Sequence, residues 1–235
     1  MKDINAWNDI LSGFDFSGLR EILIRVIPSL LCITLHELAH GFTAYALGDD
    51  TAKNAGRLTL NPIKHLDPMG LLMMVIFRFG YAKPVPVNMM KFRNPKRGMA
   101  VTALAGPMSN VVIAAVFLFF YGLFLPGLYG KGEAAQIVLE MLQTTYYLSL
   151  AMGVFNLLPI PPLDGSKVLF SLLSDEGYLK LMQVERYGFI ILAVLLYTGL
   201  LSRPLTWLVT HGLELLLPLA NWGLSLGKMI FLAGT

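Results

Sequence analysis

The sequence predicts an all-α polytopic membrane protein with about four to six transmembrane helices. Of its 235 residues, 55% are hydrophobic and only 14% are charged, whereas soluble domains carry about 25% charged residues. The apolar residues also gather in several blocks, and a bilayer-spanning helix needs about 20 of them in a row. We therefore expect one membrane-embedded domain over residues 1–235, with further membrane helices at 184–235.

Charge and cysteine content exclude two other classes. The net charge is +3, and no Lys/Arg run is interleaved with aromatic residues, so nucleic acid is not an expected partner. The single cysteine, Cys32, cannot form an internal disulfide. The first ten residues lack a basic stretch followed by an apolar core, so we expect no cleavable signal peptide.

The first predicted span covers residues 22–47 and ends at Gly48, Asp49 and Asp50. The Asn-Pro and Asp-Pro pairs of residues 48–68 predict a loop. Residues 69–77 are apolar but short, which favours a re-entrant or interfacial piece over a full span. Residues 81–88 alternate proline with valine, which is typical of an extended edge or a loop.

The second half of the chain contains two more predicted spans, 99–125 and 134–158, joined by a short turn. The proline-rich segment 159–165 then breaks the helix, and an amphipathic segment and an apolar run follow it. The last apolar stretches are 204–219 and 221–233; Pro204 and Pro218 leave open whether residues 204–233 span the bilayer or lie at its surface.

Charge along the chain predicts the orientation. Residues 48–98 carry nine Lys/Arg and three acidic residues, and positive loops favour the cytoplasmic face. Two spans later, residues 159–183 should return to that face. His40 is seven residues from Leu47, or about 10 Å of helix, so the first helix and Asp164 should meet at a similar depth near the cytoplasm.

The stretch LHELAHG places ionisable groups inside an apolar helix, which is costly and therefore usually functional. His36 and His40 are at i and i+4 and share one helix face, a spacing that suits one zinc ion, with Glu37 as general base. Catalytic zinc typically has three protein ligands, and the topology nominates Asp164 as the third. A helix-borne glutamate is the alternative third ligand; the candidates are Glu133, Glu140, Glu176, Glu185 and Glu214.

Two further interpretations stay open at this stage. The histidines could form a neutral pair that hydrogen-bonds across helices, which leaves Glu37 without a partner. Cys32, one turn before His36, could be a ligand, although a small buried thiol is the usual role of such a residue.

The HELAH motif at 36–40, together with NLLPIPPLDG at 156–165, resembles the site-2 protease family of intramembrane zinc metalloproteases. Residues 61–68, 83–88 and 106–110 are also similar to segments of its short bacterial-type members. The resemblance covers about residues 20–170, which it implies are the catalytic core. PDZ and CBS domains, which some members carry, are not expected in this chain.

This resemblance implies one Zn²⁺ per chain, held by His36, His40 and Asp164, with Glu37 as the base. Asn156 matches the family asparagine that steadies the oxyanion. Residues 83–88 resemble a re-entrant β-hairpin that would receive an extended substrate strand, and Asn110 would serve substrate binding or packing. The implied substrate-binding set is Pro84, Val85, Pro86, Val87, Asn88 and Asn110.

The implied function is intramembrane endopeptidase activity of the kind used in regulated intramembrane proteolysis. The expected partners are a transmembrane protein substrate and the lipid bilayer, and a second copy of the chain stays open. The expected location is a prokaryotic plasma membrane, with the active site toward the cytoplasm. The alternative is a transporter or proton-relay protein that uses His36, Glu37 and His40 as carriers, although we see no matching inverted halves of the kind common in transporters.

Overall fold

The computed structural model describes residues 16–69, 83–174, 176–178, 183 and 185–232. Within these residues every regular element is a helix, and no strand occurs. The elements are α2 (Phe16–Ala46), α3 (Thr51–Asn54), η1 (Pro62–His65), η2 (Met89–Lys91), α5 (Pro95–Leu128), α6 (Glu133–Asn156), α7 (Asp164–Ser171), α9 (Gly188–Tyr197) and α10 (Ser202–Phe231). The all-helical prediction is confirmed for this part of the chain.

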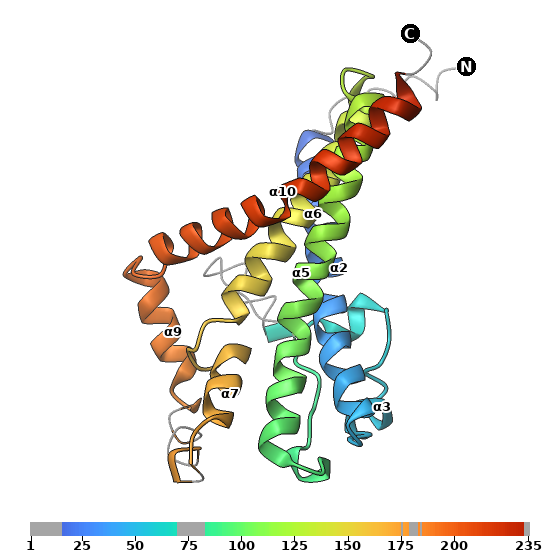
Figure 1. Ribbon diagram of the computed structural model, residues 1–235. Helices are drawn as coiled ribbons and strands as arrows, with labels where there is room; N and C mark the ends of the chain where they lie inside the picture. The colour runs from blue at the N-terminus through green and yellow to red at the C-terminus, as the bar shows by residue number, and fades with distance from the viewer. Residues whose placement is uncertain (1–15, 70–82, 175, 179–182, 184, 233–235) are drawn as a thin grey trace, which may run out of the picture.

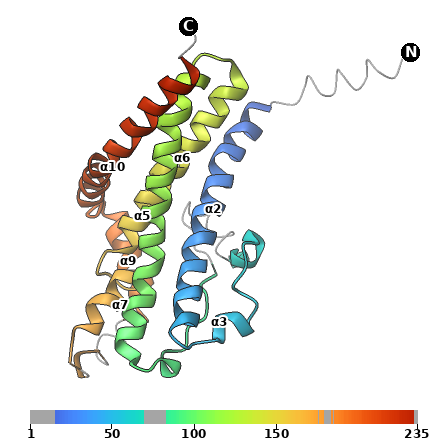
Figure 2. The same cartoon turned by 45° about the vertical axis from the view of Figure 1, so that its right-hand side comes forward.

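Helices α2, α5 and α6 lie side by side, and α5 occupies the centre (Figures 1 and 2). Helices α2 and α6 run in the opposite direction to α5, so the end of α2, the start of α5 and the end of α6 point toward the same end of the molecule. The buried side chains of Ala114, Leu150 and Val209 join α5, α6 and α10 in one apolar cluster. Helix α5 is the element against which α2, α6, α7 and α10 pack.

Local signals in the sequence explain where the long helices begin and end. Helix α2 stops at Ala46, and Gly48 follows with φ +102°, a conformation that glycine adopts at little cost. Asn94 caps α5 by accepting a hydrogen bond from the Arg97 amide at 3.2 Å, and Pro95 occupies the first helical position, where its missing N–H costs nothing. These two ends agree with the predicted boundaries to within a few residues.

The proline-rich break after α6 lies at the end of the bundle where α2 ends and α5 begins. Helix α6 ends at Asn156, and α7 begins at Asp164. A Cβ at Gly165 would overlap the carbonyl oxygen of Leu157, so only glycine allows the two segments to approach this closely. The close turn fixes Asp164, the residue next to Gly165.

The C-terminal region differs from the prediction in one respect. The sequence predicted two apolar stretches, 204–219 and 221–233, whereas the structure has one helix, α10, with Pro218 inside it. Pro204 lies in the first turn, where a proline needs no hydrogen-bonded N–H. Helix α10 meets α9 at an angle of 88°, and its second half runs along α5 (Figures 1 and 2).

By length and composition, α5 is the one helix of the described chain that could cross a membrane alone, and α9 with α10 could form a second, broken span. The predicted number of four to six spans is therefore not established. The short apolar piece at 69–77 falls almost entirely outside the described residues. Residues 83–88 are described and contain no strand, and residues 70–82 lie outside the described part of the chain, so the predicted hairpin is not established.

Glycines 223 and 227 bring α10 against the backbone of α5. A Cβ on Gly223 would overlap the carbonyl oxygen of Phe119, and one on Gly227 would overlap that of Leu123. Small residues four apart are a common means of close helix packing in membranes. The spacing was present in the sequence, but only the structure shows which helix it faces.

Replacing Gly223 with Ala should force α10 away from α5, because the obstructing atom belongs to the backbone and cannot rotate aside. We expect a loss of about 1–3 kcal/mol in the free energy of unfolding, measured by denaturant titration in detergent. Gly212→Ala is the matched control on the same helix, since its Cβ would meet only side-chain atoms of Leu150, at 3.3 Å or more. Equal stability of the two variants would contradict the close packing.

Candidate metal centre

Three potential ligand atoms from distant parts of the chain converge at one point. The Nε2 atoms of His36 and His40 lie 3.0 Å apart. Oδ2 of Asp164 lies 3.2 Å from the first and 3.1 Å from the second. All three residues are buried, at 3%, 8% and 9% exposure. The two helices that carry them, α2 and α7, flank α5 at the lower end of the molecule (Figure 1).

This triangle fits a tetrahedral metal ion. Ligands about 2.0–2.1 Å from a zinc ion lie roughly 3.3 Å from each other, close to the distances in the structure. Two imidazoles and one carboxylate are a typical donor set for catalytic zinc, which leaves a fourth position open. Among the described residues, these three form the one group of histidine, cysteine and acidic side chains close enough to hold an ion.

Helix α5 supplies the wall behind the two imidazoles. The Nδ1–H of His40 donates to the carbonyl of Thr102 at 2.7 Å, which leaves Nε2 of that ring free to bind a metal. One turn later, a Cβ on Gly106 would overlap Nε2 of His40 and lie 2.7 Å from Cε1 of His36. A glycine is therefore required where both rings pack on α5.

Asn110 completes this face of α5, one further turn along. Its side-chain amide lies 3.2 Å from Nδ1 of His36. Thr102, Gly106 and Asn110 thus share one stripe at i, i+4 spacing. Gly106 and Pro107 both lie inside α5.

The two carboxylate oxygens of Asp164 have different partners. Oδ2 faces the histidines, whereas Oδ1 lies 3.7 Å from Nζ of Lys167, one turn along α7. Asp164 is therefore arranged to give one oxygen to a metal. The sequence did not single out Lys167, although its i, i+3 spacing from Asp164 was visible.

Glu37 contacts residues 83–88, the segment in which proline alternates with valine. Its Oε2 accepts a hydrogen bond from the backbone N–H of Val85 at 2.8 Å. The Val85 side chain is buried, and its Cγ1 would lie 3.2 Å from a Cβ on Gly41, which shows how closely the segment packs on α2. Glu37 is thus tied to residues 83–88, a contact that sequence reasoning missed.

Buried polar groups anchor both ends of this segment. Arg57 donates to the carbonyl of Lys83 at 2.6 Å, and Asp49 accepts from the N–H of Asn88 at 2.6 Å. Burial alone would raise the pKa of Asp49, but hydrogen bonds from Thr51 and Asn88 hold it below its usual range. An ionised Asp49 therefore fixes the segment beside the end of α2.

The other predicted site residues differ in their burial and in their hydrogen bonds. Pro84 is exposed, and Pro86 and Val87 are half-buried; the Asn88 side chain caps η2 by accepting from Met90. Asn156 is the last residue of α6, and its Nδ2 donates to the carbonyl of Met152 at 3.0 Å. Asn110 is fully buried, which favours a role behind the imidazoles over direct contact with a substrate.

Cys32, the alternative ligand, and a nearby loop histidine, His65, both lie outside the ligand group. Cys32 is fully buried, and its Sγ lies 3.8 Å from the carbonyl oxygen of Thr145. His65 is buried in η1 and bonds through Nε2 to the carbonyl of Thr59 at 2.9 Å. Cys32 is therefore a small packed thiol, and His65 a loop-stabilising side chain.

Comparison with known proteins gives the family. Residues 126–198 match the family model described as peptidase family M50. The chain is 41% identical over 197 residues to the provisionally named zinc metalloprotease YwhC of Bacillus subtilis, covering 83% of this chain and 89% of the relative. The chain belongs to peptidase family M50.

Further relatives of this M50 peptidase are also named as zinc metalloproteases. It is 35% identical to the provisionally named zinc metalloprotease Rip2 of Mycolicibacterium smegmatis, over 77% of this chain and 70% of the relative. It is 24% identical to the zinc metalloprotease RasP of Bacillus licheniformis, over 88% of this chain and 43% of the relative. No solved structure matches the chain significantly.

Membership confirms the resemblance to the site-2 proteases and the prediction of a membrane-embedded protease. It agrees with the apolar length of α5. The transporter alternative has no support in these comparisons.

Proposed function

We propose that this M50 peptidase is a zinc-dependent endopeptidase that cuts peptide bonds within or close to the transmembrane segments of other membrane proteins. The observation that carries the proposal is the convergence of His36, His40 and Asp164 at 3.0–3.2 Å beside Glu37. The zinc assignment agrees with the names of the relatives above.

The residues divide the work of hydrolysis as follows. His36, His40 and Asp164 would hold the zinc ion, which when bound supplies Lewis-acid activation of a water molecule near neutral pH. Glu37 takes a proton from the attacking water and delivers it to the leaving amine. Val85 N–H holds the Glu37 carboxylate in place through Oε2, so its second oxygen is the one available for this transfer.

We assign Asn156 the role of stabilising the oxyanion that develops during hydrolysis. Its amide caps the end of α6 through Met152 with one N–H, and an NH₂ group has a second donor. A donor aimed at developing negative charge typically contributes about 2.7–4 kcal/mol to the transition state. We assign residues 83–88 to binding of the substrate backbone. An extended segment beside Glu37 can align an unwound substrate strand by main-chain hydrogen bonds.

A mainly apolar cavity of about 450 Å³ supports a substrate that arrives through the bilayer. It lies between α2, α6 and α10, lined by Ile33 from the first, Phe155 from the second and Leu205 from the third, among others. Ile33 is one turn before Glu37, and Phe155 directly precedes Asn156. Apolar side chains of a substrate helix could therefore reach the site without crossing water.

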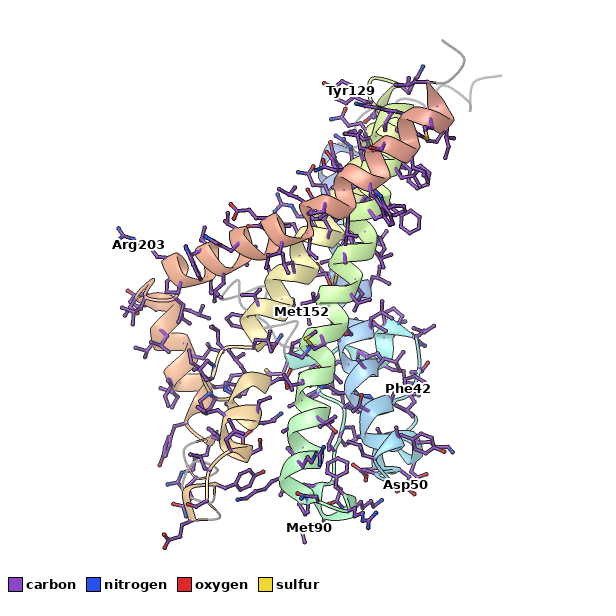
Figure 3. The ribbon with its side chains drawn as sticks, in the orientation of Figure 1. Phe42, Asp50, Met90, Tyr129, Met152 and Arg203 are labelled. Atoms are coloured by element: carbon purple, nitrogen blue, oxygen red, sulfur yellow. The ribbon has the colours of Figure 1, made fainter. Side chains whose placement is uncertain are left out.

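We also assign the site to the cytoplasmic side of a prokaryotic plasma membrane. The basic residues of 48–69 and 83–98 belong to the same end of the molecule as the ligands: Asp50 and Met90 mark that end in Figure 3, and Tyr129 marks the opposite one. Positive charge favours the cytoplasm. The finer topology, with four to six spans, is part of this proposal.

Replacing Asp164 with Ala should lower zinc affinity by more than about 100-fold, since loss of even an outer-shell partner costs up to that much. Chelator competition on the purified protein measures it. Glu214→Gln is the control and also removes one of the alternative third ligands. Unchanged zinc binding in Asp164→Ala, or loss of zinc in Glu214→Gln, would contradict the assignment.

A further inference from the structure

Asn110 is the polar side chain behind His36, and its placement is unusual for a packing residue. It is fully buried inside α5, and its amide lies 3.2 Å from Nδ1 of His36. The oxygen of the same amide, Oδ1, has no hydrogen-bond partner among the described residues. A buried amide oxygen without a donor costs about 1–3 kcal/mol, so this group calls for an explanation.

Metal binding by His36 supplies that explanation. The atom of His36 that faces His40 and Asp164 is Nε2. A neutral imidazole that binds a metal through Nε2 carries its proton on Nδ1. That proton needs an acceptor, and an amide offers one when its oxygen, rather than its nitrogen, faces the ring.

Resting on the proposed function, we propose that Asn110 is the positioning residue that sets the metal-binding tautomer of His36. With the amide turned by half a rotation about its Cβ–Cγ bond, Oδ1 accepts the Nδ1–H of His36, so the oxygen gains the partner that it lacks. Asn110 then does for His36 what the carbonyl of Thr102 does for His40.

The backbone around Asn110 is held so that the side chain can do this. Ser149 of α6 donates its hydroxyl to the carbonyl of Asn110 at 2.8 Å, which ties this turn of α5 to the neighbouring helix. A Cβ at Gly153, one turn further along α6, would lie 3.2 Å from Cβ of Asn110. The side chain is thus confined between α6 and the His36 ring, with no route to a substrate.

The test compares zinc affinity in Asn110→Leu and Asn110→Asp, by chelator competition on the full chain. Leucine keeps the volume but offers no acceptor, so affinity should fall about 10–100-fold. Aspartate keeps an acceptor oxygen in the same place and should retain most of the affinity. Thr145→Val is the matched control, because it removes a buried hydroxyl that bonds only within α6, to Met141, and its affinity should not change.

A second measurement uses the wild-type protein, in case a variant fails to fold. Nitrogen NMR of histidine-labelled, zinc-loaded protein should show His36 with its proton on Nδ1 and the metal on Nε2. Metal on Nδ1, wild-type affinity in Asn110→Leu, or equal loss in Asn110→Leu and Asn110→Asp would each overturn the inference. These failures leave the proposed function intact as long as Asp164→Ala still loses zinc; retention of zinc there would instead defeat the function itself.

Discussion

Replacing Glu37 with Gln is expected to reduce peptide-bond cleavage by at least about 10²–10⁴-fold, the usual contribution of a general base, while zinc binding stays unchanged. The amide has nearly the shape of the carboxylate but cannot take a proton from water. Glu37 is not among the three converging ligands, so its loss should not release the metal. Cleavage of a single-span substrate in detergent or vesicles, together with metal analysis of the same sample, measures both quantities.

The pairing of the two readouts is what makes the Glu37 experiment decisive. Glu214→Gln, on α10, serves as the control for replacing a carboxylate by an amide. If Glu37→Gln lost its zinc, Glu37 would be a ligand rather than a base. If it cleaved at the wild-type rate, another group would have to move the proton. The Val85 N–H would then not position the general base, as assigned above.

Replacing Gly106 with Ala should nearly abolish zinc binding and cleavage together. The added methyl group would overlap Nε2 of His40 and press on Cε1 of His36, and neither ring can retreat while its Nδ1 stays bonded to α5. We expect zinc affinity to fall by more than about 100-fold, beyond the effect of losing an outer-shell partner. Chelator competition measures the affinity.

The matched control for Gly106 adds one carbon elsewhere on the same helix. Val112 is 58% exposed, so Val112→Ile should leave both zinc affinity and cleavage unchanged. Wild-type zinc affinity in a folded Gly106→Ala protein would mean that the imidazoles do not rest on α5 as the structure shows. A circular dichroism spectrum with native helix content establishes that the variant is folded.

Much of the helical framework could be predicted because its signals are local. The apolar blocks predicted α2, α5 and α6, and Gly48 and the prolines after Asn156 predicted where two of them stop. The pairing of His36 and His40 needed only the i, i+4 rule. Even the approach of Asp164 followed from counting spans, since each span reverses the direction of the chain.

The continuity of α10 could not be predicted in the same way. Pro218 removes one backbone hydrogen bond from a helix interior, which from sequence alone favoured two segments. The structure keeps one helix because α10 gains close packing against α5 at Gly223 and Gly227. Tertiary contact therefore overrides a local breaker here, as it commonly overrides local propensity.

The sequence by itself determined the family of this protein, the residue types of its metal centre and the helix face on which two of them lie. Only the tertiary structure decided that Thr102, Gly106 and Asn110 back the imidazoles, that Val85 holds Glu37, and that the Asn110 side chain is fully buried. The reason is physical: spacing along one helix fixes which of its residues share a face. The rotation and register of one helix against another depend on the packing of side chains that are far apart in the chain.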